Sequence, residues 1–331
     1  MDRSTTSQLL SLLNEAEKPL SGALLGQKLG ISRQAVWKGI SGLTEEGFEI
    51  ERGGRGYRLR ALPKRLHAEA LRLLLAADWP DALIQVKERT QSTNLDVKQL
   101  LDTEQAPLLL VAARAQEGGR GRLGRSFFSP PGGLYFSFAW HRDQPIDQVG
   151  FITILAAVAV YQAVKEHCGR ALTIKWVNDL ELAGRKVCGI LTEGRAGLES
   201  GVIDSLLVGI GLNVRTPEGG FPAELDHRAG ALFDQAPQDL NENRLLAAIV
   251  QHYFDFAKRP QDGLALYRAR CSTLGQRITY QGPDQRKQRG RALAIDDTGG
   301  LVVADADDRR STLRFGEVQL IKEPLPNEGQ I

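Results

Sequence analysis

Residues 22–60 specify one folding unit by local signals alone; they read GALLGQKLGISRQAVWKGISGLTEEGFEIERGGRGYRLR. Ser21 and Ser32 each precede a helical stretch, where a serine oxygen can accept a hydrogen bond from a first-turn N–H. Gly30 and Gly47 follow those stretches, as residues that end helices do. The alternating segments after Gly47 surround a glycine-rich turn and predict a β-hairpin.

A further short helix is predicted upstream, over residues 4–14, because leucines cluster there. The order helix, helix, tight turn, helix and hairpin is typical of a winged helix-turn-helix, which we assign to residues 1–62. In that fold the third helix enters a major groove of DNA and the hairpin lies against phosphates. A three-helix protein-interaction domain of the same shape is the alternative.

Polar residues of the third helix and of the hairpin favour DNA over a protein partner. Arginine and glutamine at the N-terminal end of such a helix can read base edges, and arginines on the wing can contact phosphates. Residues 1–65 also hold eleven Lys or Arg against seven Asp or Glu. A single module of this kind binds weakly, so a specific operator would demand a dimer with two half-sites. The DNA-binding candidates are Ser32, Arg33, Gln34, Lys38, Arg52, Arg55 and Arg58.

Composition predicts a cytoplasmic, multidomain protein. The 331 residues are 42% hydrophobic and 25% charged, which suits two or three globular domains. We expect no membrane association, because no apolar run approaches the length of a membrane span and the N-terminus lacks the pattern of a secretory signal. The three cysteines are odd in number and far apart, so we expect reduced thiols and no structural metal site.

Beyond a linker at residues 61–66, the chain mixes strand and helix patterns over residues 67–270. The pattern includes strand-like GLYFSFAW and SLLVGIGLNV, a long apolar helix over GFITILAAVAVYQAVKEHC, and an amphipathic helix that begins after Asn241. This mixture predicts an α+β domain with a largely antiparallel or mixed sheet. Four short strand-like segments over residues 272–323 then predict a small β-barrel.

The loop at residues 116–125, QEGGRGRLGR, carries the strongest chemical signal. Its glycines let the backbone approach a ligand closely, and its arginines offer planar forks of donors to carboxylates and phosphates. Such a loop can hold two anionic groups together, as a reaction between a carboxylate and a nucleotide phosphate requires. The alternative is a flexible RG-rich segment that binds nucleic acid, but such tracts usually repeat.

A second cluster lies in KWVND (residues 175–179) and GRKVCGIL (residues 184–191). We expect consecutive strands to bring Asp179 and Lys186 to one site. Lys186 would stabilise charge that develops on a carboxylate or phosphate oxygen, and Asp179 would orient or deprotonate an amine. Taken alone, such a pair is more often a surface salt bridge.

These motifs together resemble those of the biotin–protein ligases. The matching stretches are GRGRLGR with its SPPGG tail, KWVNDL, GRKVCGILTE, GIGLNV and the earlier Ser92-Thr93-Asn94, in the order and approximate spacing of that family. The resemblance covers nearly the whole chain and is strongest to the bifunctional ligase–repressors of the BirA family. It implies an α+β multidomain fold with a winged helix, a mixed-sheet ligase domain similar to class II synthetases, and a C-terminal SH3-like barrel.

The resemblance implies a two-step reaction. Biotin and Mg·ATP give biotinyl-5′-AMP and pyrophosphate, and a lysine of a biotin carboxyl carrier protein then displaces AMP. The magnesium arrives with ATP, so no separate metal site is implied. It also implies repression of biotin-synthesis genes at operator DNA by a homodimer that biotinyl-AMP promotes.

The roles of individual residues follow from their places in the motifs. Lys186, Arg120, Arg122 and Asp179 would be catalytic. Arg125, Phe127 and Asn213 would join Arg120, Arg122 and Lys186 at the nucleotide. Biotin would meet Ser92, Thr93, Asn94, Gln116, Gly119, Arg120, Arg122, Lys186, Gly189 and Gly209.

One position departs from the family pattern, because Phe127 stands where similar ligases carry tryptophan. Three alternatives remain open at this point. A lipoate–protein ligase would share the fold and the adenylate chemistry, a pure transcription factor would keep the pocket as a sensor, and an active ligase could have lost operator recognition.

Overall fold

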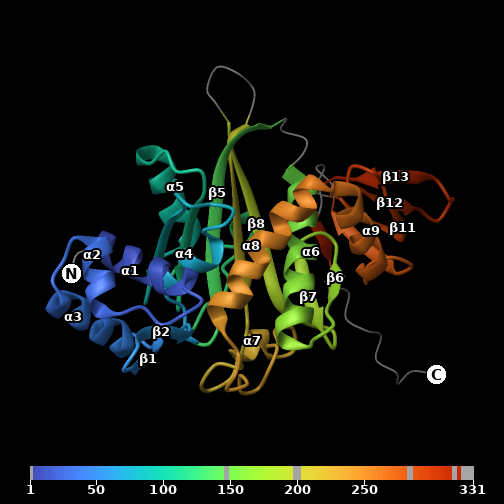
Figure 1. The fold of residues 1–331 in the computed structure, drawn as a ribbon. Coiled ribbons are helices and arrows are strands. Elements are labelled where there is room, and N and C mark those ends of the chain that lie inside the picture. The colour runs from blue at the N-terminus through green and yellow to red at the C-terminus, as the bar shows by residue number, and fades with distance from the viewer. Residues whose placement is uncertain (1–2, 145–148, 197–202, 282–285, 315–318, 322–331) are drawn as a thin grey trace.

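The computed structural model describes residues 3–144, 149–196, 203–281, 286–314 and 319–321. The N-terminal part has the predicted winged helix-turn-helix order (Figure 1). Ser21 and Ser32 cap their helices by accepting hydrogen bonds from the Leu24 and Ala35 N–H groups. The elements are α1 (Arg3–Glu15), α2 (Gly22–Leu29), α3 (Arg33–Glu45), β1 (Glu49–Gly53) and β2 (Gly56–Ala61).

Within the described residues, the central domain is built on a seven-stranded sheet of order β3-β4-β5-β9-β8-β7-β6. Only β3 and β4 pair in parallel, so the predicted mixed and largely antiparallel sheet is confirmed. Its strands are β3 (Leu83–Lys87), β4 (Leu109–Ala113), β5 (Leu134–Gln144), β6 (Thr173–Lys175), β7 (Asp179–Leu182), β8 (Arg185–Ala196) and β9 (Ile203–Leu212).

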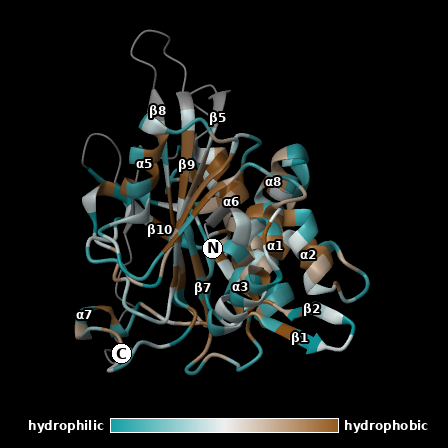
Figure 2. Cartoon of the chain, turned by 60° about the vertical axis from the view of Figure 1, so that its left-hand side comes forward, coloured by the Kyte–Doolittle hydropathy of each residue, from teal (hydrophilic) through white to brown (hydrophobic). Residues whose placement is uncertain are grey.

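Helices cover both faces of this sheet. Successive strand residues point to opposite sides, so alternate residues of one strand belong to two different cores. On one face, Leu206, Val208 and Ile210 join a core with α4 (Ala68–Leu75), α6 (Val149–Cys168) and α8 (Glu242–Lys258). On the other face, Leu207 packs with α5 (Thr93–Thr103). Figure 2 shows hydrophobic residues gathered along β9 and α6. The odd-numbered β9 residues therefore face α5.

Helix α6 corrects the expectation about apolar runs. Its residues Gly150–Cys168 are long and apolar enough to cross a membrane by length and composition, although 67% of that window is buried inside the structure. The helix packs between the sheet and α8 as the core helix of the domain.

The linker at residues 61–66 is anchored along its length. The Asn243 side chain donates hydrogen bonds to the carbonyls of Pro63 and Arg65, each at 2.8 Å, and accepts one from the His67 N–H at 2.7 Å. Leu66 is buried in the core of the central domain. The α4 residue Ala70 belongs to the core of the N-terminal domain, so the two domains share packing.

The C-terminal part forms a five-stranded antiparallel sheet among the described residues, of order β13-β12-β11-β10-β14. The last of the four predicted segments divides into two strands, β13 and β14. The strands are β10 (Arg277–Gln281), β11 (Lys287–Ile295), β12 (Leu301–Ala304), β13 (Arg310–Leu313) and β14 (Gln319–Ile321). The preceding α9 (Pro260–Arg270) and the short α7 (Ala223–Asp226) carried no signal that we recognised in the sequence.

The C-terminal sheet is fastened to the ligase domain at Trp176. The Trp176 backbone N–H donates to the Thr273 hydroxyl at 2.9 Å, and its indole N–H donates to the Gly299 carbonyl at 3.1 Å. Trp176 also lines a cavity that includes Arg120 and Lys186, so the C-terminal domain helps to set the wall of that cavity.

Candidate active site

A cavity of about 690 Å³ lies on the α5 face of the sheet. Its floor is hollow because β8 and β9 present glycines there: Gly189 is paired with Gly211, and Gly209 with Leu191. A Cβ added to Gly211 would lie 2.4 Å from the Phe127 ring, and one at Gly209 would lie 1.9 Å from the Asn94 amide oxygen. The glycines are thus required by what packs over them.

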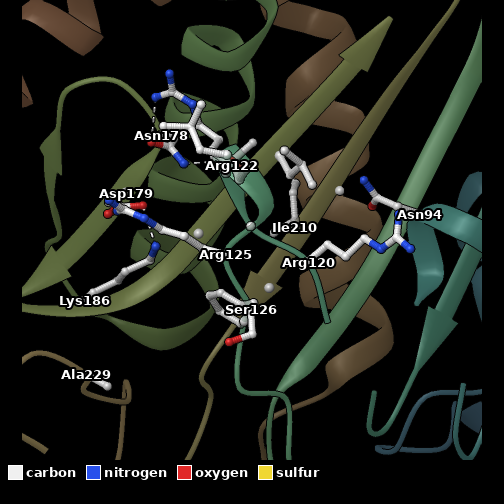
Figure 3. Close-up of a pocket in the computed structure, with 18 of the residues that line it drawn as sticks. Asn94, Arg120, Arg122, Arg125, Ser126, Asn178, Asp179, Lys186, Ile210 and Ala229 are labelled. Atoms are coloured by element: carbon white, nitrogen blue, oxygen red, sulfur yellow. Dashed lines mark hydrogen bonds and ion pairs between the residues drawn. The ribbon is translucent and has the colours of Figure 1, made fainter. Parts of the chain in front are cut away.

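The loop predicted to bind anions forms one wall of the cavity (Figure 3). It folds back as a tight hairpin, with Gly121 N–H donating to the Arg125 carbonyl at 2.7 Å and Phe127 N–H donating to the Gly119 carbonyl at 2.8 Å. Leu123, at the tip, has φ 56° and is 65% exposed. A non-glycine residue held in the left-handed region is uncommon, and such residues cluster at active sites and ligand clamps.

All three loop arginines line the cavity, as predicted: Arg120, Arg122 and Arg125. Arg122 reaches the Asn178 side-chain oxygen at 3.5 Å. Burial lowers the pKa of the Arg122 guanidinium, and the nearby Asp179 carboxylate partly offsets this effect. Figure 3 shows Arg120 extending toward Asn94, at the far end of the cavity from Asp179. The arginines therefore offer positive charge along the cavity.

Lys186 and Asp179 meet as the sequence predicted. Strands β7 and β8 bring the Lys186 ammonium to 2.6 Å from the Asp179 carboxylate, and both side chains are about a third exposed, at 32% and 28%. The ammonium also lies 5.5 Å from the centre of the Phe127 ring. A half-buried lysine that can leave its carboxylate partner for an incoming anion is suited to electrostatic catalysis.

Phe127 forms part of the floor. Its ring lies against Gly189 and Gly211 and meets Tyr135 edge-on, with the centroids 6.5 Å apart. Burial raises the pKa of the Tyr135 hydroxyl, which donates to the Pro130 carbonyl at 2.8 Å. The aromatic pair thus links the end of the loop to β5.

A chain of hydrogen bonds holds the remaining predicted residues. The Gln116 side-chain oxygen accepts from the Thr93 N–H at 2.9 Å and lies 3.1 Å from the Thr93 hydroxyl oxygen, and the Gln116 amide donates to Ser129 at 2.9 Å. Ser129 donates to the Phe127 carbonyl at 3.0 Å. Ser92, Asn94 and Gln116 line the cavity, whereas Thr93 and Gly119 lie behind its wall and support it.

Asn94 belongs to the same network. It accepts from the Ser137 hydroxyl at 2.5 Å and donates to the Glu193 carboxylate at 2.7 Å. Ser129, Ser137, Asn178 and Glu193 were not singled out as site residues from the sequence. Alternation along β5 and β8 could have shown which of their residues share a face, but not which strands become neighbours.

Asn213 is not among the residues that line the cavity, and its place near the phosphates stays a prediction. Asn213 is buried, its N–H donates to the Val187 carbonyl at 2.8 Å, and its side-chain amide donates to the Gly230 carbonyl at 2.9 Å. Arg228 and Ala229, just before Gly230, line the cavity. The Asn213 NH2 group therefore holds the backbone next to two cavity-lining residues.

The predicted DNA-binding residues lie on the surface of the winged helix. Arg33, Gln34 and Lys38 are exposed on α3, Ser32 is exposed at its N-cap, and Arg55 is exposed at the hairpin turn. Arg52 is also exposed and donates long hydrogen bonds to Ser41 at 3.3 Å and Thr44 at 3.4 Å of α3. Arg58 is half-buried.

Three family models match the chain in order: "HTH domain" over residues 5–58, "Biotin/lipoate A/B protein ligase family" over 86–213 and "Biotin protein ligase C terminal domain" over 273–320. Among solved structures, the biotin protein ligase of Aquifex aeolicus in complex with biotin and ATP has a similar fold. Its TM-score is 0.59 at 24% identity, over 73% of this chain and 99% of that one.

Two curated relatives span almost the whole chain. The bifunctional ligase/repressor BirA of Bacillus subtilis is 33% identical over 306 residues, which cover 89% of this chain and 92% of the relative. The Escherichia coli BirA is 29% identical over 332 residues, or 99% of this chain and 97% of the relative. This chain therefore belongs to the family of the bifunctional BirA ligase/repressors.

Proposed function

We propose that the protein is an ATP-dependent biotin–protein ligase that also represses transcription in response to biotin. One observation carries the ligase half: three loop arginines and Lys186 line the same cavity as the polar wall of Ser92, Asn94 and Gln116. Such a cavity offers a cationic region for a carboxylate and a nucleotide phosphate beside a polar region for a neutral ring. The three units would span residues 1–62, 67–270 and 272–323.

The first half-reaction joins two anions. A carboxylate oxygen of biotin attacks the α-phosphorus of Mg·ATP, the bond to the β-phosphate oxygen breaks, and pyrophosphate leaves. Arg120, Arg122 and Lys186 would stabilise the charge that accumulates on the phosphate oxygens. The loop over residues 116–125 would keep water from the mixed anhydride.

The second half-reaction would use Asp179. When Lys186 turns to the phosphate, the Asp179 carboxylate loses the partner it has at 2.6 Å and can accept a proton from an incoming lysine amine. That amine attacks the carbonyl carbon of biotinyl-AMP and AMP leaves. We propose a biotin carboxyl carrier protein as the acceptor.

The ligase half is tested by transfer of labelled biotin to a carrier domain, with lipoate and octanoate as competitors. Biotin-specific, ATP-dependent labelling supports the proposal. Preferential use of lipoate or octanoate would make the protein a lipoate-type ligase, and binding without transfer would leave a non-catalytic biotin sensor.

The repressor half rests on the family and on the exposed α3 residues Arg33, Gln34 and Lys38. We propose a cytoplasmic homodimer, promoted by biotinyl-AMP, that binds an inverted-repeat operator. Ligand and DNA affinity would then be coupled through dimerisation. Sedimentation with and without biotin plus Mg·ATP should show a shift toward dimer, and no shift would contradict this coupling.

Fluorescence anisotropy tests DNA binding directly, with an inverted repeat from upstream of the host's biotin-synthesis genes at physiological salt. Tight binding that requires biotin and Mg·ATP supports both activities. Weak binding that ignores biotin would leave a ligase whose winged helix no longer represses.

A further inference from the structure

Glu193 lies behind the cavity wall, and each oxygen of its carboxylate accepts a hydrogen bond from a different side chain. Its Oε2 accepts from the Asn94 amide at 2.7 Å, and its Oε1 accepts from the Lys98 ammonium at 2.7 Å. Asn94 and Lys98 belong to α5, whereas Glu193 belongs to β8. The carboxylate thus joins the helix that begins at the cavity to the sheet beneath it.

An ionised carboxylate can only accept hydrogen bonds, so it decides how the Asn94 amide is turned. The NH2 group must face Glu193, and the oxygen must face the other way. There it accepts from the Ser137 hydroxyl at 2.5 Å and lies over the α-carbon of Gly209, in the cavity floor.

The direction set at Asn94 continues along the network. Because Ser137 gives its proton to Asn94, Ser137 must accept from the Thr93 hydroxyl, which is 2.7 Å away. The Glu193 carboxylate therefore fixes donors and acceptors from Asn94 through Ser137 to the Thr93 hydroxyl. The Thr93 backbone N–H separately fixes the Gln116 amide, whose oxygen accepts from it and whose NH2 group is left for Ser129.

We propose that Glu193 is a positioning residue that presents the Asn94 amide oxygen, and not its NH2 group, to the ligand. An acceptor at this place fits the N–H groups of biotin's ureido ring, whereas an NH2 group would face them with a second donor. The inference rests on biotin as the ligand of the proposed function.

Glu193→Gln provides an unusually sharp test because of Lys98. A glutamine at this position has one acceptor and one donor end, and the Lys98 ammonium requires the acceptor. The glutamine NH2 group then faces Asn94 and turns its amide over. Loss of one well-placed hydrogen bond, with a donor opposed to a donor, should raise the Kd for biotin about tenfold or more.

Removing Lys98 should reverse the effect. In Lys98→Met/Glu193→Gln, the glutamine can turn its oxygen to Asn94 again, so we expect a biotin Kd within about threefold of wild type. Lys98→Met alone should leave the Kd unchanged, because the carboxylate still accepts from Asn94. A role in packing alone would give no rescue in the double variant.

The measurement is titration calorimetry of the full chain with biotin alone, with thermal unfolding of each variant as the folding control. An unchanged Kd in Glu193→Gln, or a raised Kd that Lys98→Met does not restore, would overturn the proposal. In an Asn94→Ala background, Glu193→Gln should have no further effect, and an added loss there would also overturn it. Wild-type protein that fails to bind biotin at all would instead refute the proposed function.

Discussion

At the scale of single residues, charge in the cavity governs the chemistry. Arg120 and Lys186 both line the cavity and are held by different elements, the loop and β8. We predict that Arg120→Ala and Lys186→Ala each lower biotin-dependent ATP–pyrophosphate exchange by about 100-fold or more, as the loss of one electrostatic contact does in other active sites. Lys258→Ala, on α8 at the opposite face, is the control and should not change the rate. Near-normal rates in both cavity variants would mean that the site is elsewhere.

Phe127 controls how much apolar surface the cavity offers. Its ring lies on Gly189 and Gly211, beneath the Lys186 ammonium. Phe127→Trp adds ring area and should slow the dissociation of biotinyl-AMP, by about 1 kcal/mol at most. A chase of labelled adenylate measures this rate, and an unchanged rate would rule out a role for this residue in adenylate retention.

The cysteines are protected from reagents by their surroundings. Burial raises the pKa of Cys168 to about 11 and also raises the pKa values of Cys188 and Cys271. Because the thiolate is the reactive form, a raised pKa leaves less of it at neutral pH. We predict slow alkylation by iodoacetamide at pH 8 that accelerates as the pH approaches 11. The denatured chain is the comparison and should react rapidly at pH 8; equally fast reaction of the native protein would contradict the prediction.

At the scale of elements, the start of α8 holds the linker between the domains. Asn243 is fully buried and satisfies the backbone of Pro63, Arg65 and His67 at once. Asn243→Ala leaves buried polar groups without partners, so it should lower the free energy of unfolding by about 3 kcal/mol. The N-cap variant Asn241→Ala removes the cap and one 3.1 Å hydrogen bond to the Pro63 carbonyl, and should cost about 1 kcal/mol. Urea denaturation compares the two, and equal effects would show that the additional contacts of Asn243 with Arg65 and His67 contribute little.

At the scale of the whole molecule, Glu69 joins the DNA-binding and ligase domains. Its carboxylate accepts from Ser7 of α1 at 2.5 Å and pairs with Arg72, which in turn donates to the Ile84 carbonyl of β3 at 2.7 Å. Glu69 is 7% exposed. This contact spans from the winged helix to the edge of the central sheet, so it fixes the angle between the domains.

We predict that Glu69→Ala loosens the domain pair. Trypsin should then cut at Lys64 or Arg65 several-fold faster, since proteolysis follows local opening. Differential scanning calorimetry should show two unfolding transitions in the variant, where the wild type shows one. A cleavage rate equal to that of wild type would mean that apolar packing at Ala70 is sufficient to hold the domains together.

Local signals were enough to predict the winged helix and the cluster around Lys186. The caps at Ser21 and Ser32 act within a few residues, and the β7–β8 hairpin pairs Lys186 with Glu181, two residues from Asp179, so neighbours in sequence become neighbours in space. The arginine loop was recognisable because its arginines can bind anions and its glycines let the backbone approach a ligand, whatever the rest of the fold. The motif alone did not show that the Asn213 side chain donates to the Gly230 carbonyl, since a motif does not reveal which backbone group a polar side chain will bind.

The sequence by itself determined the kinds of elements, their order and the chemistry of the loop. Only the tertiary structure decided that β5, β8 and β9 lie side by side, and so that Ser137, Glu193 and Gly209 gather around Asn94. Strand order in a sheet depends on contacts between residues far apart along the chain. The free energy of such contacts comes from burial of whole faces, which local patterns do not encode.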